Sequence, residues 1–387
     1  MKFFHTADWH LGKLVQGVYM TEDQQYVLEQ LIEAIVEEKP DAIIIAGDLY
    51  DRSIPPTEAV HLLNETFEKI VLDLQTPILA IAGNHDSPSR LHFGSKIMQK
   101  NGLHIVGQFK KNPEPIILED EFGEIHFHLI PYCEPSVVRN ELENGEIRTH
   151  DDAMKAIVEE ITEQMDSTAR HVVVSHSFVT PLGRAEENTS ESERPLSIGG
   201  SEYVNANHFL PFHYTALGHL HQAHYVEDEK IRYAGSILKY SISEEKHKKG
   251  FYIVDMDGEG KVEVEKRLLA PKRDMRMVEA TLEELYTHPE SDDYVFVKLL
   301  DETPVLSPME KVKSVYKNAM HVERKQFTVS LDGERTDVKR SKMSDVELFQ
   351  SFYKEVKGSE PEEEAELIFK EALEELLKKD NESSTGS

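Results

Sequence analysis

The sequence predicts an α/β protein with more than one domain. Continuous apolar runs such as "DAIIIAG" and "PILAIAG" alternate with amphipathic helical segments in the first half of the chain. Strands that alternate with helices at this spacing are typical of βαβ units, in which a largely parallel sheet is covered on both faces. The length of 387 residues exceeds that of one ordinary domain, so we expect two or three units.

The first half supplies the elements of the sheet in order. "KFFHTAD" predicts a short buried strand, and residues 21–38 predict an amphipathic helix. A second helix begins at Thr57, between the strands "DAIIIAGD" and "PILAIAGN". Further strands are predicted at 103–106, 125–130, 171–175, 214–218, 231–234 and 250–255, with a helix at 151–165. We therefore place a first domain at residues 1–270.

The pattern changes near residue 270, where "APKRDMRM" is typical of a linker. Residues 275–332 predict a small α/β unit with a helix near 281–286, the strand "YVFVKLL", a helix at 308–319 and the strand "RKQFTVSL". Residues 343–380 predict a helical hairpin with apolar stripes. The stripes include Val346, Phe349, Phe352, Tyr353, Val356, Ile368 and Leu376. Because exposed apolar faces promote aggregation, the hairpin should have a binding partner.

The composition restricts the classes of function and compartment. A formal net charge of −29 argues against binding nucleic acid through Lys and Arg alone, so phosphate contacts would come from metal ions or from a basic partner. Cys133 is the one cysteine, which excludes an intrachain disulfide and is typical of a reducing compartment. No apolar stretch approaches the roughly 20 residues of a membrane span. We expect a cytoplasmic protein with no membrane association.

Polar side chains follow the predicted strands at the points where these strands end. They are Asp8, His10, Asp48, Asp51, Asn84, His85, Asp86, His176, His219 and His221. The loops at the carboxyl ends of parallel strands meet at one edge of a sheet, so residues far apart in sequence can share one site.

The ligand types in this set indicate metal chemistry. Oxygens from Asp and Asn combined with His nitrogens suit Mn²⁺, Fe or Zn better than Ca²⁺. The set is too large for one tetrahedral ion and suits two ions that share a carboxylate. Two ions about 3.5–4 Å apart are the standard arrangement for phosphoester hydrolysis.

Each motif alone also has a structural interpretation. "DWH" and "GDLYD" can be turn or cap sequences, and "SH" can simply end a strand. "GHLH" is more specific, because alternate residues place both imidazoles on one side. "GNHD" is the strongest, because a plain turn gains nothing from an imidazole. The occurrence of all five along the chain, in the order DWH, GDLYD, GNHD, SH and GHLH and each after a buried strand, favours a functional site.

These motifs resemble the calcineurin-like metallophosphoesterases, which implies a β-sandwich with flanking helices. "HTADWHLGK" and "YTALGHLHQAH" resemble more closely the SbcD family of bacterial nuclease subunits, over roughly residues 1–380. The resemblance implies a metal-dependent DNA nuclease, a double-strand exonuclease and a single-strand or hairpin endonuclease, that acts in break repair and recombination.

The resemblance also implies a role for each position. Asp8, His10 and His221 would hold one divalent ion. Asn84, His176 and His219 would hold the other, Asp48 would bridge both, and Mn²⁺ is the expected metal.

Beside the ions, His85 would stabilise the scissile phosphate and protonate the leaving oxygen, as general acid catalysis requires. Asp51 would orient His85 by a hydrogen bond. Asp86 and Trp9 are expected to be structural, with Trp9 packing between two ligands.

The expected partners follow from the same resemblance. The hairpin 343–380 would bind the coiled coil of an SbcC-type, SMC-like ATPase, and the 275–332 unit would be a capping domain that helps to recognise DNA. Helices near 57–72 and 88–100 resemble the contacts of a homodimer within a heterotetramer. The protein would then be associated with the nucleoid.

Two alternatives remain open. The chain could hydrolyse nucleotides or phosphoproteins, although the residues beyond the first domain argue against this. It could also be a non-catalytic scaffold of the same fold, an interpretation that predicts missing ligands, and none is missing.

Overall fold

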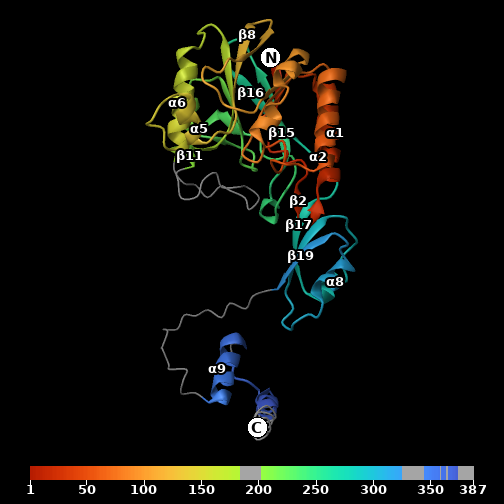
Figure 1. Ribbon diagram of the computed structural model, residues 1–387. Coiled ribbons are helices and arrows are strands. Elements are labelled where there is room, and N and C mark those ends of the chain that lie inside the picture. The colour runs from red at the N-terminus through yellow and green to blue at the C-terminus, as the bar shows by residue number, and fades with distance from the viewer. Residues whose placement is uncertain (184–201, 325–343, 358, 363–364, 374–387) are drawn as a thin grey trace, which may run out of the picture.

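Two six-stranded sheets packed face to face form the main body of the molecule (Figure 1). The computed structural model describes residues 1–183, 202–324, 344–357, 359–362 and 365–373. The first sheet has the order β16-β15-β1-β4-β5-β6, with β1 (Lys2–Thr6), β4 (Ala42–Ile45), β5 (Ile78–Ile81), β6 (Leu103–Val106), β15 (Gly250–Met256) and β16 (Val262–Leu268). The second has the order β13-β14-β12-β9-β8-β7, with β7 (Ile116–Asp120), β8 (Gly123–Ile130), β9 (Arg170–His176), β12 (Tyr214–Gly218), β13 (His224–Val226) and β14 (Asp228–Tyr233).

Four consecutive strands of each sheet are parallel. β1, β4, β5 and β6 run parallel in the first sheet, and β8, β9, β12 and β14 run parallel in the second. The strands β15, β16, β7 and β13 extend these sets through antiparallel pairs. The parallel sheet expected from the sequence is therefore two mixed sheets.

Apolar side chains fill the space between the sheets and the space beneath the helices. Phe3 of β1 packs edge-on against Phe127 of β8, with ring centroids 5.8 Å apart. Helices α1 (Thr21–Glu38) and α2 (Thr57–Glu68) cover the outer face of the first sheet, and α5 (Pro135–Glu141) and α6 (His150–Glu163) cover that of the second (Figure 1). Each sheet is thus covered by helices on one face and by the other sheet on the opposite face, which is the predicted sandwich.

Short elements connect these layers. They are β2 (Leu14–Val15), β3 (Val18–Tyr19), the π-helix η1 (Lys69–Asp73), α3 (Pro88–His92), α4 (Ser95–Met98), η2 (Gln99–Asn101), β10 (Phe178–Thr180), β11 (Tyr203–Asn205), η3 (Ala206–Phe209) and η4 (Ile242–Glu244). Several of the loops between them carry the polar residues discussed below.

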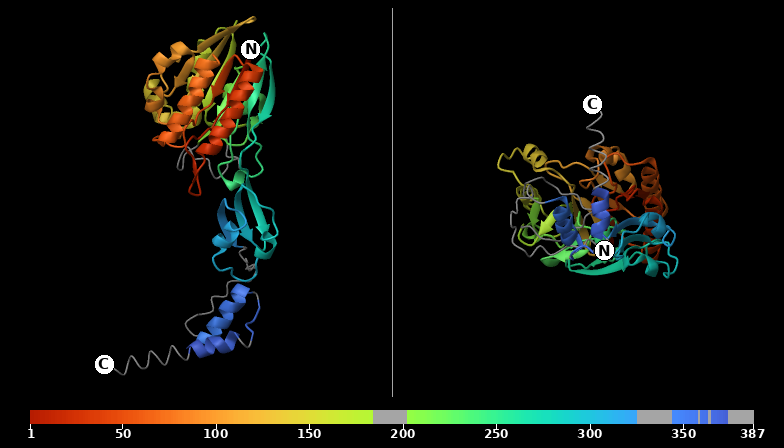
Figure 2. Two further views of the ribbon diagram at one scale, coloured as in Figure 1. Left: turned by 90° about the vertical axis from the view of Figure 1, so that its right-hand side faces the viewer. Right: turned by 90° about the horizontal axis from the view of Figure 1, so that it is seen from below.

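A separate three-stranded parallel sheet follows the main body (Figure 2). It contains β17 (Met275–Ala280), α7 (Leu282–Leu285), β18 (Tyr294–Leu299), α8 (Pro308–Lys313) and β19 (Ala319–Arg324). The sequence interpretation was wrong on the expected linker, part of which is β17. β19 precedes the expected strand "RKQFTVSL", and the residues of that strand after Arg324 lie outside the described part. The helix expected at 308–319 ends at Lys313. Residues 325–332 lie outside the described part.

Two helices end the described chain. α9 (Asp345–Lys357) packs against a helix at 365–373, where the rings of Phe349 and Phe369 stack with centroids 4.2 Å apart. Figures 1 and 2 show this pair apart from the sandwich. Residues 374–380 of the expected hairpin lie outside the described part. Among the helices that the structure describes, none combines the length and the apolar character needed to cross a membrane.

Candidate metal centre

The predicted site residues converge at one edge of the sandwich. Asp8 follows β1, Asp48 follows β4 and Asn84 follows β5, while His176 ends β9 and His219 follows β12. The two sheets present the carboxyl ends of their parallel strands to the same place, where the side chains of three groups lie close together: Asp8, His10 and His221; Asp8, Asp48 and His176; and His10, Asp51 and His85. The expected convergence at the strand ends is therefore present.

The backbone at this edge adopts a conformation that residues other than glycine rarely adopt. Asp8, His10, Asp48 and His219 have φ values of 52°, 45°, 50° and 104°. Left-handed backbone at such residues costs free energy and is concentrated at functional sites. The strained backbone at these four residues is consistent with a requirement to hold their side chains in fixed positions at the site.

Two glycines allow the strand ends to approach the polar groups closely. A Cβ atom on Gly83 would lie 2.1 Å from Asp48 Oδ1, and one on Gly47 would lie 2.2 Å from His176 Nδ1. Both positions therefore require glycine.

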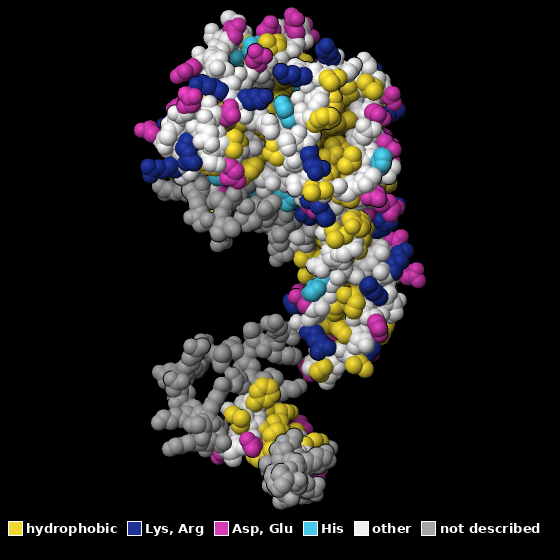
Figure 3. All heavy atoms as spheres, viewed as in Figure 1, with side chains coloured by type: hydrophobic (Ala, Val, Ile, Leu, Met, Phe, Trp, Pro, Cys, Tyr) yellow, Lys and Arg dark blue, Asp and Glu magenta, His cyan; other side chains and the backbone are white. Residues whose placement is uncertain are grey.

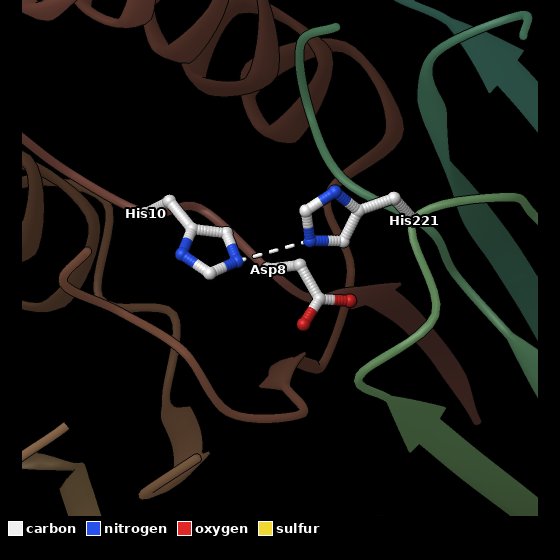
Figure 4. A group of neighbouring side chains, drawn as sticks. All are labelled: Asp8, His10 and His221. Atoms are coloured by element: carbon white, nitrogen blue, oxygen red, sulfur yellow. Dashed lines mark hydrogen bonds between the residues drawn. The ribbon is translucent and has the colours of Figure 1, made fainter. Parts of the chain in front are cut away.

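The first group joins the loop after β1 to the loop after β12. Figure 4 shows Asp8, His10 and His221 pointing toward one another. The Nε2 atoms of His10 and His221 lie 3.1 Å apart, and Asp48 Oδ2 lies 3.6 Å from His10 Nε2. His221 Nδ1 donates to the Glu244 carboxylate at 3.1 Å, so the neutral ring presents a lone pair at Nε2. Two imidazole nitrogens and a carboxylate face one another, as they would around a cation.

The second group brings together Asp48, His176 and Asn84. His176 Nδ1 donates to the Ala46 carbonyl at 2.9 Å, which leaves Nε2 as the acceptor nitrogen of the neutral ring. This Nε2 lies 3.0 Å from Asn84 Oδ1 and 3.3 Å from Asp48 Oδ2. A lone pair that faces two oxygens requires either a proton or a metal ion between them.

His219 contacts another predicted ligand, Asp8, through its main chain. Its main-chain N–H donates to both carboxylate oxygens of Asp8, at 3.0 and 3.2 Å. Its ring lies 5.4 Å from that of His176, measured between centroids. It borders the second group but does not belong to the three close groups of the described residues.

His85 lies beside the ligand groups. Its main-chain N–H donates to Asp48 Oδ1 at 2.9 Å, and its ring centroid lies 4.6 Å from that of His10. The predicted hydrogen bond with Asp51 is present, but it uses the main-chain carbonyl of Asp51, 2.8 Å from His85 Nδ1. The Asp51 carboxylate instead pairs with Lys13 at 2.8 Å.

Asp86 and Trp9 have structural contacts. The Asp86 carboxylate accepts hydrogen bonds from the main-chain N–H groups of Leu49, Tyr50 and Gly83, which ties together the two loops that carry Asp48 and Asn84. Trp9 is fully buried, and its indole N–H donates to Thr6 Oγ1 at 3.0 Å. This buried ring cannot stack on a base.

Sequence reasoning missed three buried polar residues around the site. Gln24 of α1 donates to the carbonyls of Trp9 and His10 and accepts from Gly12, which fixes the loop that carries two predicted ligands. Glu244 and Lys249 form a buried ion pair beside His221. Polar residues in a helix or in a charged loop give no local indication in the sequence that they are buried. Only the folded structure identifies these three residues.

The electrostatics of the site reflect burial and close charges. Burial raises the pKa of Asp8 to about 7, and the nearby Asp48 carboxylate acts in the same direction. Burial alone would lower the pKa of His176, but Asp48 outweighs this effect and the pKa rises to about 9. Burial lowers the pKa of His10 and of His219. Buried carboxylates close to the imidazoles of His10 and His219, whose charged forms burial disfavours, form an environment that a divalent cation stabilises.

The donor set therefore fits divalent metal ions. It combines carboxylate and amide oxygens with imidazole nitrogens, which suits borderline transition metals better than Ca²⁺. Two acceptor-lined groups that meet at Asp48 are consistent with a pair of ions.

The chain matches two family models. Residues 1–223 match the calcineurin-like phosphoesterase model, and residues 271–357 match a model described as the type 5 capsule protein repressor C-terminal domain. Among curated proteins, the SbcD subunit of the nuclease SbcCD from Staphylococcus epidermidis is 34% identical over 358 residues, which is 92% of this chain and 93% of that protein.

Solved structures also resemble the chain, at lower similarity. A dimetal phosphatase from Danio rerio is 11% identical and has a TM-score of 0.39, covering 70% of this chain and 97% of its own. A protein from Thermus thermophilus is 10% identical with a TM-score of 0.37, covering 68% and 98%. The match to the Staphylococcus epidermidis protein, which covers most of both sequences, is the one that shows the family. The chain belongs to the calcineurin-like phosphoesterases and, within them, to the family of the SbcD subunit of the nuclease SbcCD.

Proposed function

We propose that this chain is a metal-dependent DNA nuclease subunit that cleaves double-strand ends and hairpins together with an SMC-like ATPase. The observation that carries the proposal is the pair of acceptor-lined groups at the sandwich edge, where His10 Nε2 faces His221 Nε2 and His176 Nε2 faces Asn84 and Asp48. The Staphylococcus epidermidis relative is named as a nuclease subunit, which supports the same activity.

The ligand assignment follows the grouping of the side chains. Asp8, His10 and His221 would hold one ion, Asn84, His176 and His219 the other, and Asp48 would contact both. Mn²⁺ is the metal we propose, as the resemblance to the SbcD family implies. The mixture of oxygen and imidazole ligands supports a borderline transition metal of this kind. Bound divalent ions would polarise the phosphoryl oxygens and activate the attacking nucleophile.

His85 would act directly on the phosphodiester, and Asp51 would hold His85 in position. The Asp51 carbonyl accepts from His85 Nδ1 and fixes the ring, so Nε2 is the atom that would donate a proton to the leaving oxygen. The main-chain bond from His85 to Asp48 fixes this residue relative to the metal ligands. His85 is therefore the proposed general acid, and Asp51 its positioning residue.

The three parts of the chain would have separate tasks. Residues 1–270 would form the nuclease domain and residues 275–332 a capping domain that contributes to DNA recognition. With a net charge of −29, DNA contacts would depend on the metal ions and on a basic surface of the partner.

Residues 343–380 would bind the ATPase coiled coil. Phe352 is 62% exposed and Ile368 is 60% exposed, on different helices of the pair. Figure 3 shows hydrophobic side chains gathered on this part of the molecule. Helix-in-groove or helix-bundle packing would bury them. Deletion of residues 341–387 should leave hydrolysis of a small phosphodiester intact and abolish stimulation by the ATPase. Loss of folding of the sandwich would contradict this assignment.

A homodimer would use the face formed by α2, α3 and α4. An apolar groove of about 500 Å³ lies there, lined by residues that include Leu63, Phe67 and Leu91. Phe93, which lines this groove, is 85% exposed, and Ile97 of α4 is 75% exposed. A second copy that covers this face would bury both side chains.

The proposed activity is tested on blunt duplex and hairpin DNA. The native protein and His85→Leu are compared in Mn²⁺, in Mg²⁺ and after chelation. We expect Mn²⁺-dependent cleavage that the substitution abolishes, while metal content stays near two ions per chain. Hydrolysis of a small phosphodiester without any DNA cleavage would instead favour a phosphoesterase for nucleotides or phosphoproteins.

A further inference from the structure

A buried ion pair lies directly behind His221. Glu244, at the end of η4, is 0% exposed, and Lys249 is 8% exposed. Glu244 Oε1 accepts from His221 Nδ1 at 3.1 Å, and Glu244 Oε2 accepts from Lys249 Nζ. The carboxylate therefore connects a proposed metal ligand to a buried ammonium group.

The ammonium group of Lys249 has a full set of acceptors. Besides Glu244, it donates to the main-chain carbonyl of His221 at 2.9 Å and to Ser236 Oγ at 2.7 Å. Lys249 thus contacts the backbone of the same residue whose ring Glu244 contacts. Together the pair fixes both the main chain and the side chain of His221.

A buried ion pair is not explained by stability alone. The desolvation cost of burying two charges often equals or exceeds their attraction, and apolar residues of similar volume can replace such pairs without loss of stability. A carboxylate bonded to Nδ1 of a metal-ligating histidine has a different effect: it fixes the tautomer and the ring orientation so that Nε2 points to the metal.

The turn that carries Glu244 also forms a hydrogen bond with the small α/β unit. Glu245, the next residue, accepts from the main-chain N–H of Met277 in β17 at 2.8 Å. Adjacent residues of one turn therefore contact the proposed metal centre and the small α/β unit. The backbone of Glu244 is consequently fixed between the two.

We propose that Glu244 is a positioning residue for the metal centre: it holds His221 with Nε2 toward the ion that Asp8 and His10 share, while its other carboxylate oxygen accepts from Lys249. The inference rests on the proposed function, because it requires that His221 binds an ion. It predicts that Glu244 matters for the affinity of one ion and not of the other.

Two double variants separate the hydrogen bond from the ion pair. Glu244→Gln with Lys249→Met keeps an acceptor oxygen for His221 Nδ1, whereas Glu244→Met with Lys249→Met removes it. Both remove the two charges together, so neither leaves one charge buried alone. Glu245→Gln is the matched control, since its side-chain oxygen can still accept from Met277 and does not contact His221.

Mn²⁺ binding to the full chain, stripped of metal, is measured by titration calorimetry, with thermal unfolding of each stripped variant alongside. We expect the native protein, the control and the Gln–Met variant to bind two ions with affinities within about threefold of each other. The Met–Met variant should bind one ion about 10–100-fold more weakly. At saturating Mn²⁺ its kcat for a small phosphodiester should recover.

Each other outcome has a distinct meaning. Native-like binding of both ions by the Met–Met variant would overturn the inference, and so would equal weakening in both double variants, since packing would then be the cause. If the native protein bound no ion, the proposed function itself would fail. We expect the two stripped double variants to have unfolding temperatures within a few degrees of each other. A lower unfolding temperature for the Met–Met variant alone would attribute its weak binding to misfolding and would overturn the inference.

Discussion

His85 Nδ1 donates a hydrogen bond to the main-chain carbonyl oxygen of Asp51, at 2.8 Å, and not to the Asp51 carboxylate. The orientation of the proposed general acid is therefore independent of the Asp51 side chain. That carboxylate instead pairs with Lys13 and lies 3.7 Å from His10 Nδ1.

Asp51→Asn should consequently affect cleavage much less than loss of His85 does. We expect kcat to fall by less than about tenfold in Asp51→Asn and by about 10²–10⁴-fold in His85→Leu, the range of general acid catalysis. Single-turnover cleavage of a hairpin substrate at saturating Mn²⁺ measures both. Equal losses in the two variants would show that the carboxylate, and not the carbonyl, controls His85.

Gly83→Ala should disrupt the metal centre through steric contact alone. The added Cβ would lie 2.1 Å from Asp48 Oδ1 and 2.4 Å from the Asp48 main-chain nitrogen, so Asp48 must shift. We expect loss of at least one bound ion after dialysis, measured by elemental analysis. Gly145→Ala is the control, because nothing lies within 4 Å of its added Cβ. Two retained ions in Gly83→Ala would argue against Asp48 as the shared ligand.

The ion pair between Asp120 and Arg170 should make stability depend on pH. Arg170 donates to both carboxylate oxygens and holds the pKa of Asp120 far below its ordinary value. Because the folded-state pKa is the lower one, this stability is complete above the unfolded pKa and is lost as pH falls through the folded pKa.

Asp120→Asn should lower the free energy of unfolding by about 2–3 kcal/mol at pH 7 and at pH 5. The difference from the native protein should shrink as the pH falls below about 4, where the unfolded carboxyl takes up its proton. Urea unfolding at pH 7, 5 and 3.5 measures this dependence. A difference that is constant over all three values would show that Asp120 does not titrate with folding.

The exposed apolar face beside α2 should mediate dimerisation. Phe93→Glu places a charge at a side chain that is 85% exposed in the single chain and would be buried in the dimer. We expect a shift from dimer to monomer by sedimentation equilibrium, with cleavage of a small phosphodiester unchanged. Leu306→Glu is a matched control, since Leu306 is 82% exposed on the small α/β unit. A dimer that survives Phe93→Glu and Ile97→Glu together would place the interface elsewhere.

Elements with a strong apolar pattern were predictable from the sequence. The helix at 21–38 and the strands at 103–106 and 214–218 have the expected bounds, because each is buried on at least one side. β16 escaped prediction because it is partly exposed: it reads "VEVEKRL" and lies at the edge of its sheet. Its charged residues resemble those of a loop, and only pairing with β15 makes it a strand.

The site was predictable for a different reason. Asp8, Asp48, Asn84 and His176 each stand at the end of an apolar strand, so the topology of a parallel sheet brings them together. Glu244 and Lys249 follow no such rule. They lie within "SEEKHKKG", which has the composition of a solvated loop, and their burial depends on contacts with His221 and Ser236.

The most direct measurement of the proposed two-ion centre is anomalous diffraction from crystals soaked in Mn²⁺. Two anomalous peaks about 3.5–4 Å apart are expected, with the Asp48 carboxylate between them, Asp8, His10 and His221 around one, and Asn84 and His176 around the other. A single peak away from Asp48, or none at this edge of the sandwich, would contradict the assignment of the site as a two-metal phosphodiesterase centre.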